Sequence, residues 1–282
     1  MKKCIKFMFA TVICSAIMIS CEKESVDPVE NNSTTISKEV SSKLLTLNFN
    51  PNVVTKQVIQ DIDGSEQEVY FVEKDIVMTY DQIMNMEIGD GVDSKQYRTF
   101  NLVSTPRTIR VVGYNGNDRF GLSTIAQRGL NYAVNNFNAL NVDFQIELVF
   151  TTNFNNNDVV AYTQTSNSVI PQDGVRGRAG FPSGGEPFKR VMINGGANRN
   201  NNDQLLEGLF THELGHCFGL RHVDWFSRES CGESGEPANP DGAIHIPGTP
   251  TGRDRSSIMN ACFNSNDGEF GQFDRVALEY LY

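Results

Sequence analysis

The sequence predicts a mixed α/β (α+β) fold, in which two main helices cover a twisted, mostly parallel sheet and an irregular, glycine-rich lobe follows. Three observations support this fold class. The chain has 282 residues, of which 39% are hydrophobic and 21% charged, as in ordinary folded proteins. Strand-like and helix-like segments alternate from residue 105 onward, which favours a parallel sheet. After the last long helix the apolar periodicity stops and glycines become frequent.

The first twenty residues have the pattern of a secretory signal peptide. A basic start precedes an apolar run over residues 7–19, and this run is too short to be a good membrane-spanning helix. The following MISC resembles the lipobox of bacterial lipoproteins, which predicts Cys21 as the acylated N-terminus of the mature chain. The alternative is an ordinary signal peptide with an incidental Cys21. Either pattern places the protein in the cell envelope, anchored by lipid to the outer membrane or cell surface, or secreted.

Two segments precede the part that carries the chemistry. Residues 21–42 are polar and acidic without apolar periodicity, so we expect a flexible tether. Residues 43–104 contain extended runs at 43–49, 66–79 and 97–104 and a helical turn at 80–86. They predict an N-terminal subdomain or a pro-segment. No residue of this segment indicates chemistry, and its lack of cysteine excludes a thiolate that would cap a metal.

We expect the remaining residues, 105–282, to form the domain that carries the chemistry. A β-rich run at 108–114 precedes a helix with apolar residues at helical spacing over 120–140. Strands follow in the ranges 143–152, 158–165 and 190–196. A long helix over residues 204–220 then begins behind Asp203, which we expect to be its N-cap.

The stretch HELGHCFGLRH, residues 212–222, predicts a metal site, and it holds three of the four histidines of the chain. His212 and His216 lie four residues apart, so a helix directs both imidazoles to one point. Glu213 stands beside that point, where it can act as a base. Gly219 can end the helix, which lets His222 supply a third nitrogen. Three neutral imidazoles leave Zn²⁺ one open position, as catalytic sites require. The alternative is an amphipathic helix whose histidines are merely polar. The probability that the five positions of the motif match by chance is on the order of 10⁻⁸ to 10⁻⁷ per starting site.

The same stretch resembles the HExxHxxGxxH signature of the metzincin metallopeptidases, in which a methionine follows in a tight turn. The tract SSIMN supplies Met259. More narrowly, the chain resembles the bacterial dual-action HEIGH metallopeptidases through HELGH, IPGTP (246–250), SIMN and a closing helix over 273–282. The likeness spans about residues 98–282. Where some metzincins carry a tyrosine two residues after the methionine, this chain has Ala261.

The resemblance implies a metzincin-like fold with an antiparallel edge strand, for which residues 177–182 are the candidate, and a C-terminal helix. It implies that an extended protein or peptide substrate lies along this edge. Met259 would form a hydrophobic floor under the metal. Zinc-activated water would attack the peptide bond, with Glu213 as general base.

The other candidate residues lie near or after the histidines. Asp224 could hold His222 or His216 through a free ring nitrogen. Cys4 and Cys14 leave with the signal peptide and Cys21 would be acylated. Of the three remaining cysteines, Cys231 and Cys262 lie in the irregular lobe, so we predict a disulfide between them and a free, inert Cys217.

These patterns favour a secreted or surface-anchored zinc endopeptidase. The formal charge of −10 becomes −13 when the first twenty residues, with their three lysines, are removed, which disfavours nucleic acid and anionic membranes as partners. We therefore expect the protein to contact the membrane only through its lipid anchor. We also expect a monomer. Two alternatives remain: a zinc hydrolase of another amide or ester, and a binding lipoprotein with a vestigial metal site. The retained Glu213 speaks against the second.

Overall fold

The computed structural model describes residues 36–87, 97–164, 174–225, 227–233, 244–250, 253–262 and 268–282. The predicted signal peptide, Cys21 and residues 21–35 of the predicted tether lie outside these ranges. Among the helices within them, none has the length and apolar character needed to cross a membrane.

The main sheet has five strands in the order β6-β5-β7-β9-β8. Its strands are β5 (Arg107–Tyr114), β6 (Phe144–Thr151), β7 (Val159–Thr163), β8 (Gly177–Arg178) and β9 (Arg190–Ile193). All neighbouring pairs are parallel except β8 and β9, which are antiparallel. The structure thus confirms the predicted fold class, a mostly parallel sheet with an antiparallel edge strand.

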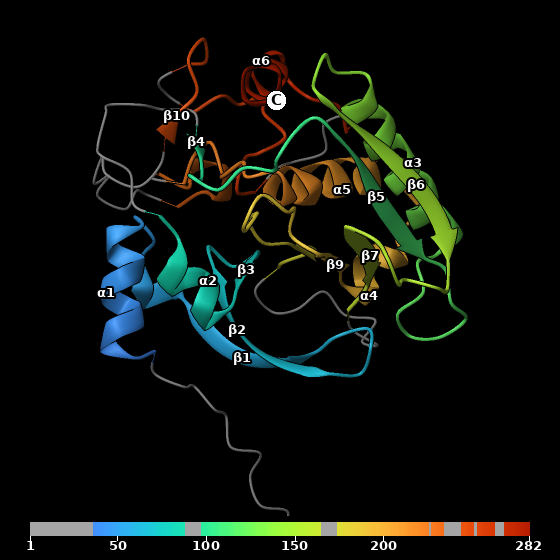
Figure 1. Ribbon diagram of the computed structural model, residues 1–282, viewed down its shortest axis with the longest axis horizontal. Coiled ribbons are helices and arrows are strands. Elements are labelled where there is room, and N and C mark those ends of the chain that lie inside the picture. Colours follow the sequence, from blue (N-terminus) through green and yellow to red (C-terminus); the bar gives the residue numbers. More distant parts are fainter. Residues whose placement is uncertain are drawn as a thin grey trace, which may run out of the picture. The chain divides into compact units, whose positions relative to one another are not determined.

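Two long helices, α3 (Thr124–Asn138) and α5 (Asp203–Cys217), pack on one face of this sheet (Figure 1). The side chain of Ser123 caps α3, and the apolar positions of the helix fall at helical spacing, so that one face is buried. The short helix α4 (Gly195–Asn198) follows β9. This layer forms the largest core of the described residues and contains the helix that carries the histidines.

The opposite face of the main sheet is covered by an N-terminal antiparallel sheet. Its strands are β1 (Thr55–Gln60), β2 (Glu66–Val72) and β3 (Ile76–Met78). Because side chains alternate along a strand, Val111 of β5 joins the helical core while Val112 packs with Phe71 and Val77 of the N-terminal sheet. The N-terminal segment and the part of the chain from residue 105 onward therefore share a hydrophobic core.

The N-terminal segment begins with a helix where we expected tether and strand. Helix α1 (Lys38–Thr46) starts inside the range assigned to the tether, and the prediction of an extended run at 43–49 is wrong. Ser37 caps the helix, and Val40 and Leu44, one helical turn apart, are both buried. The segment continues with η1 (Pro51–Val53) and later with α2 (Tyr80–Asn85), at the position of the predicted helical turn.

The C-terminal lobe has little regular structure before its closing helix. It contains η2 (Glu229–Cys231), β10 (Ile244–His245), which pairs with β4 (Tyr97–Arg98), and α6 (Gln272–Leu281). A disulfide joins Cys231 to Cys262, which is the predicted pairing. Cys217 is free and buried, and burial raises the pKa of its thiol, so the thiol stays protonated and inert.

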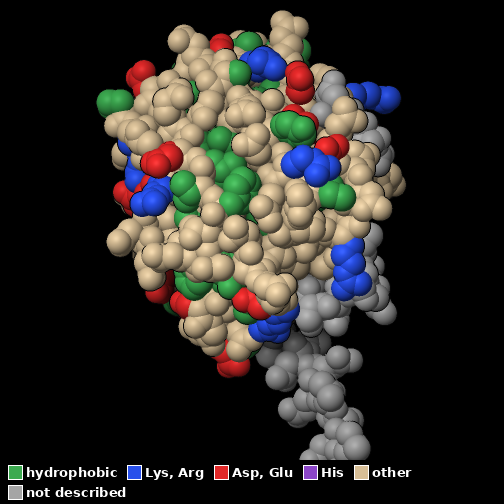
Figure 2. Space-filling view, turned by 90° about the vertical axis from the view of Figure 1, so that its right-hand side faces the viewer, with side chains coloured by type: hydrophobic (Ala, Val, Ile, Leu, Met, Phe, Trp, Pro, Cys, Tyr) green, Lys and Arg blue, Asp and Glu red, His purple; other side chains and the backbone are tan. Residues whose placement is uncertain are grey.

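On the face shown in Figure 2, lysines and arginines lie singly among acidic side chains instead of forming a continuous basic patch, and no histidine is visible among the described side chains.

Candidate active site

Helix α5 and the turn after it place the three histidines. The side chain of Asn202 accepts hydrogen bonds from the backbone N–H groups of Gln204 and Leu205, so Asn202 is the N-cap and not Asp203, which lies in the first turn. At the other end Gly219 has a φ of 92°. The N–H of Leu220 donates to the carbonyl of Gly215, which closes the helix in a Schellman turn.

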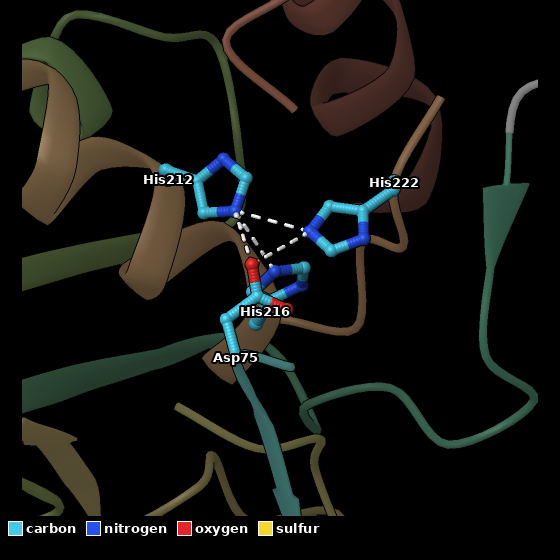
Figure 3. Close-up of side chains that lie close together, drawn as sticks. All are labelled: Asp75, His212, His216 and His222. Carbon is cyan, nitrogen blue, oxygen red and sulfur yellow. Dashed lines mark hydrogen bonds and ion pairs between the residues drawn. The ribbon is translucent and has the colours of Figure 1, made fainter. Parts of the chain in front are cut away.

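This turn brings His222 back toward the two histidines of the helix. The Nε2 atom of His212 lies 3.1 Å from Nε2 of His216 and 3.3 Å from Nε2 of His222. All three side chains are buried. The structure therefore gathers the three predicted ligands around one point (Figure 3).

The outer nitrogens of the same rings show which tautomers are present. Nδ1 of His212 lies 2.8 Å from the carbonyl of Ile258, and Nδ1 of His216 lies 2.7 Å from the carbonyl of Leu220. A carbonyl can only accept, so both Nδ1 atoms carry hydrogen, and in the neutral form of each ring the Nε2 atom presents its lone pair to the site.

Lone pairs that face one another without a proton repel, and a bound cation removes that repulsion. In a tetrahedral zinc site with bonds of about 2.0–2.1 Å, ligand nitrogens lie about 3.3 Å apart, close to the distances observed here. The donor set of the described residues thus fits Zn²⁺.

A fourth side chain, which we did not predict, reaches the same point. Asp75 is the last residue of the turn between β2 and β3, and its Oδ2 atom lies 3.2 Å from Nε2 of His222 and 3.8 Å from Nε2 of His212. Its other oxygen is buried and has no hydrogen-bond partner among the described atoms. Figure 3 shows the carboxylate directed at the three rings. The four side chains together form a group that could hold a metal ion.

Glu73, two residues earlier, orients His222 from behind. Its carboxylate lies 2.7 Å from Nδ1 of His222 and accepts a hydrogen bond of 2.6 Å from Arg221. Burial alone would raise the pKa of Glu73, but the charges of Arg221 and His222 outweigh it and hold this pKa at about 2. Glu73 is therefore ionised and fixes the ring of His222 with its Nε2 atom toward the site.

The charges around His222 favour a cation at the centre of the site. Burial lowers the pKa of this imidazole, but the carboxylates of Asp75 and Glu73 outweigh burial and raise it to about 10. The negative potential that would retain a proton there also attracts a metal ion, which binds the neutral ring in place of the proton.

Glu213 lies beside the histidines, with a buried carboxylate. Its Oε2 atom has no hydrogen-bond partner among the described atoms. Burial, and then the charge of Asp75, raise the pKa of Glu213 well above its usual range. The carboxylate lies close to the backbone of β8. A Cβ atom built on Gly177 would lie only 2.4 Å from its Oε1 atom. A group of this kind is suited to receive and return a proton.

Met259 lies beneath the histidine helix. A Cβ atom built on Gly215 would lie 2.6 Å from its sulfur, so the methionine side chain packs directly against the helix at this glycine. The turn around Met259 is held by Asp274 of α6, which accepts hydrogen bonds from the Ser257 hydroxyl and from the N–H groups of Ile258 and Gly271. The backbone carbonyl of Ile258, the residue before Met259, accepts the hydrogen bond from Nδ1 of His212.

A cavity of about 440 Å³ adjoins the site. Its walls come from β8 and the residues before it, from α5, from the β2–β3 turn and from the end of the methionine turn. The lining residues include Val175, Arg176, Gly177, Leu205, Leu209, His212, Glu213, Asp75 and Ala261.

Comparison with known protein families decides the assignment. A family profile described as dual-action HEIGH metallo-peptidase matches residues 69–282, more than half of the chain. The chain belongs to this family. It is therefore a metallopeptidase, and the predicted family resemblance is confirmed.

Other comparisons add less. Two solved structures of myroilysin are similar, each with a TM-score of 0.39 and 11% sequence identity. One covers 64% of this chain and 82% of the myroilysin chain, and the other covers 70% and 91%. No curated protein sequence matches the chain.

The match to the metallopeptidase family begins at residue 69, whereas we expected the likeness to begin at about residue 98. The matched range therefore includes the β2–β3 turn with Glu73 and Asp75. Leu214 stands in place of the isoleucine that gives the family its name, and it is fully buried in the core of the helical layer.

The prediction that Asp224 holds His222 or His216 is wrong. The Nδ1 atoms of these rings are occupied by Glu73 and by the carbonyl of Leu220. Asp224 is buried and accepts hydrogen bonds from the N–H groups of Ser230 and Ala261, so it ties the loop after the third histidine to the methionine turn.

Sequence reasoning missed Glu73 and Asp75 because it searched the N-terminal segment for cysteine alone. A carboxylate can also bind zinc. The tract EKD between two apolar runs, residues 73–75, was the available signal, since acidic residues in a hairpin turn project from the end of a sheet.

Proposed function

We propose that this metallopeptidase is a zinc-dependent endopeptidase of the metzincin type. Three imidazole rings direct their Nε2 atoms to one point, and a hydrogen-bond acceptor holds the Nδ1 atom of each ring. This arrangement carries the proposal. Family membership supports it independently, because the matched range contains all three histidines and Glu213.

In this proposal the residues of the chain divide the work. When Zn²⁺ is bound, it acts as a Lewis acid and lowers the pKa of a water molecule. Glu213, next to the ligands but not among them, accepts the proton of the attacking water and returns it to the leaving amine. The apolar surroundings that raise the pKa of Glu213 favour this second step, because they help the carboxyl group to hold the proton until it is transferred.

The substrate would bind as an extended peptide along β8. An edge strand offers free backbone groups to an added strand, and this one passes directly beside Glu213. The adjoining cavity, with Leu205 and Leu209 in its wall, would take a side chain of the substrate.

We further propose that the protein is exported and anchored through an acylated Cys21. The basic and apolar N-terminal pattern and the tract MISC support this proposal. A mass spectrum of the mature protein tests it, because acylation and removal of residues 1–20 change the mass together. An unmodified Cys21 within an intact N-terminus would contradict it.

Cleavage of a mixed peptide library tests the proposed reaction. We expect zinc-dependent cleavage that is lost with a chelator, restored by zinc and abolished in Glu213→Ala, while Glu66→Ala, an exposed carboxylate of the N-terminal sheet, behaves as the wild type. Cleavage that survives chelation or the loss of Glu213 would contradict the mechanism.

A further inference from the structure

The edge strand proposed for the substrate is covered by the chain itself. The N–H of Val77 donates to the carbonyl of Ala179 over 2.6 Å, and the N–H of Ala179 donates to the carbonyl of Asp75 over 3.1 Å. Ile76 and Ala179 form a parallel bridge. The predicted edge at 177–182 therefore begins as β8 and continues at Ala179 in contact with the start of β3. These hydrogen bonds use the backbone groups that an added peptide strand would need.

The same segment also reaches the metal site, through the side chain of Asp75. The Asp75 carboxylate lies within 3.2 Å and 3.8 Å of two ligand nitrogens, on the side facing the β2–β3 turn. Zinc also takes carboxylate oxygen as a ligand, and four protein ligands make a closed site, whereas catalysis requires an open position for water. With Asp75 as the fourth ligand, Glu213 has no water to deprotonate.

The turn that presents Asp75 is held in an unusual conformation. Glu73 and Lys74 have φ angles of 50° and 79°, in the left-handed region that residues with side chains adopt only at an energetic cost. Such strain persists only where the surroundings fix it. Here Arg221 and His222 bind the Glu73 carboxylate, and Nε of Arg178 donates to the carbonyl of Lys74.

We propose that residues 73–77 form an internal plug that keeps the peptidase latent, with the Asp75 carboxylate as fourth metal ligand and the backbone of residues 75–77 on the substrate edge. This inference rests on the proposed function. Peptide hydrolysis then requires withdrawal of the β2–β3 turn, which frees the fourth coordination position and the edge strand in one movement.

The plug limits the access of small ligands to the metal and the access of peptides to the edge strand by different groups. A carboxylate ligand alone would limit only the first. Losing the Asp75 side chain opens the metal to a small ligand but leaves the backbone of residues 75–77 in place. We therefore expect access for small ligands to be regained in full and access for peptides only in part, through easier displacement of the turn.

Cobalt substitution tests the plug without relying on activity. The full chain is loaded with Co²⁺, and its visible absorption spectrum is recorded during titration with acetohydroxamate, a small bidentate metal ligand. We expect no spectral change in the wild type and a saturable change in Asp75→Ala. Asp75→Asn preserves the size of the side chain and guards against misfolding, and Glu66→Ala serves as the control for loss of an exposed carboxylate from the same sheet. The zinc affinity of Asp75→Ala should fall at least about tenfold through loss of the ligand.

A wild-type spectrum that responds to acetohydroxamate as readily as that of Asp75→Ala would overturn the plug, and so would the absence of a response in both Asp75 variants. Peptide cleavage separates the two proposals. We expect Asp75→Ala to cleave about tenfold faster than the wild type or more, since weakening the closed state raises the open fraction. An Asp75→Ala chain that binds acetohydroxamate but cleaves no peptide would contradict the proposed function while leaving the plug intact.

Discussion

Replacing Glu73 by glutamine should destabilise the full-length chain through two neighbours at once. The Glu73 carboxylate pairs with Arg221 over 2.6 Å and with Nδ1 of His222 over 2.7 Å, and all three side chains are buried. Glutamine keeps the shape but loses the charge, and its amide can present an acceptor to only one of the two donors.

The size of the effect follows from these contacts. Breaking a buried ion pair costs about 3–5 kcal/mol. Arg221 keeps the carbonyls of Leu47 and Asn48 as acceptors and stacks on the ring of Phe49, so the lower end of that range applies. A loss of about 3 kcal/mol in the free energy of unfolding corresponds to a decrease of roughly 6–12 °C in Tm for a chain of this size.

Urea unfolding of the metal-free protein measures this loss, and competition with a chromophoric chelator measures zinc affinity, which should fall about 10- to 100-fold because His222 loses the group that orients it. The matched control is Glu66→Gln, which should stay within about 0.5 kcal/mol of the wild type. A Glu73→Gln chain as stable as this control would refute the assignment of Glu73.

Three further predictions concern the groups around the site. Gly177→Ala places a methyl group against the Glu213 carboxylate, so turnover should fall while the zinc content measured by atomic absorption stays the same. Gly215→Ala forces the Met259 sulfur aside and should cost about 1–3 kcal/mol in urea unfolding; unchanged stability would contradict the close contact. Burial raises the pKa of Asp274 from 3.8 to about 6, so the folded state binds the proton more tightly. Stability should therefore fall by roughly 3 kcal/mol as pH rises from about 4 to above 6, and Asp274→Asn should lack this dependence.

The part of the site that could be predicted from sequence is local. His212, His216 and Glu213 lie on one helix, and Gly219 ends that helix so that His222 can return to it, which means that spacing alone determines the arrangement. The alternation of strands and helices after residue 105 likewise predicted a mostly parallel sheet with two covering helices, but not the order of its strands.

The part that could not be predicted depends on contacts between distant segments. Glu73 meets His222 across 149 residues, and no local pattern specifies that encounter. The same limit explains the error at Asp224, because its assignment assumed that the outer nitrogen of His222 or His216 was free. Helix α1 was missed for a different reason: the apolar residues at 44, 45, 47 and 49 suit a strand as well as a helix, and the Ser37 cap lay in the range assigned to the tether.

X-ray absorption at the zinc edge of the zinc-loaded full chain tests the central claim most directly. The account predicts four nitrogen or oxygen neighbours at about 2.0–2.1 Å, with the multiple-scattering pattern of three imidazoles. A sulfur neighbour, or a pattern of fewer than three imidazoles, would contradict it.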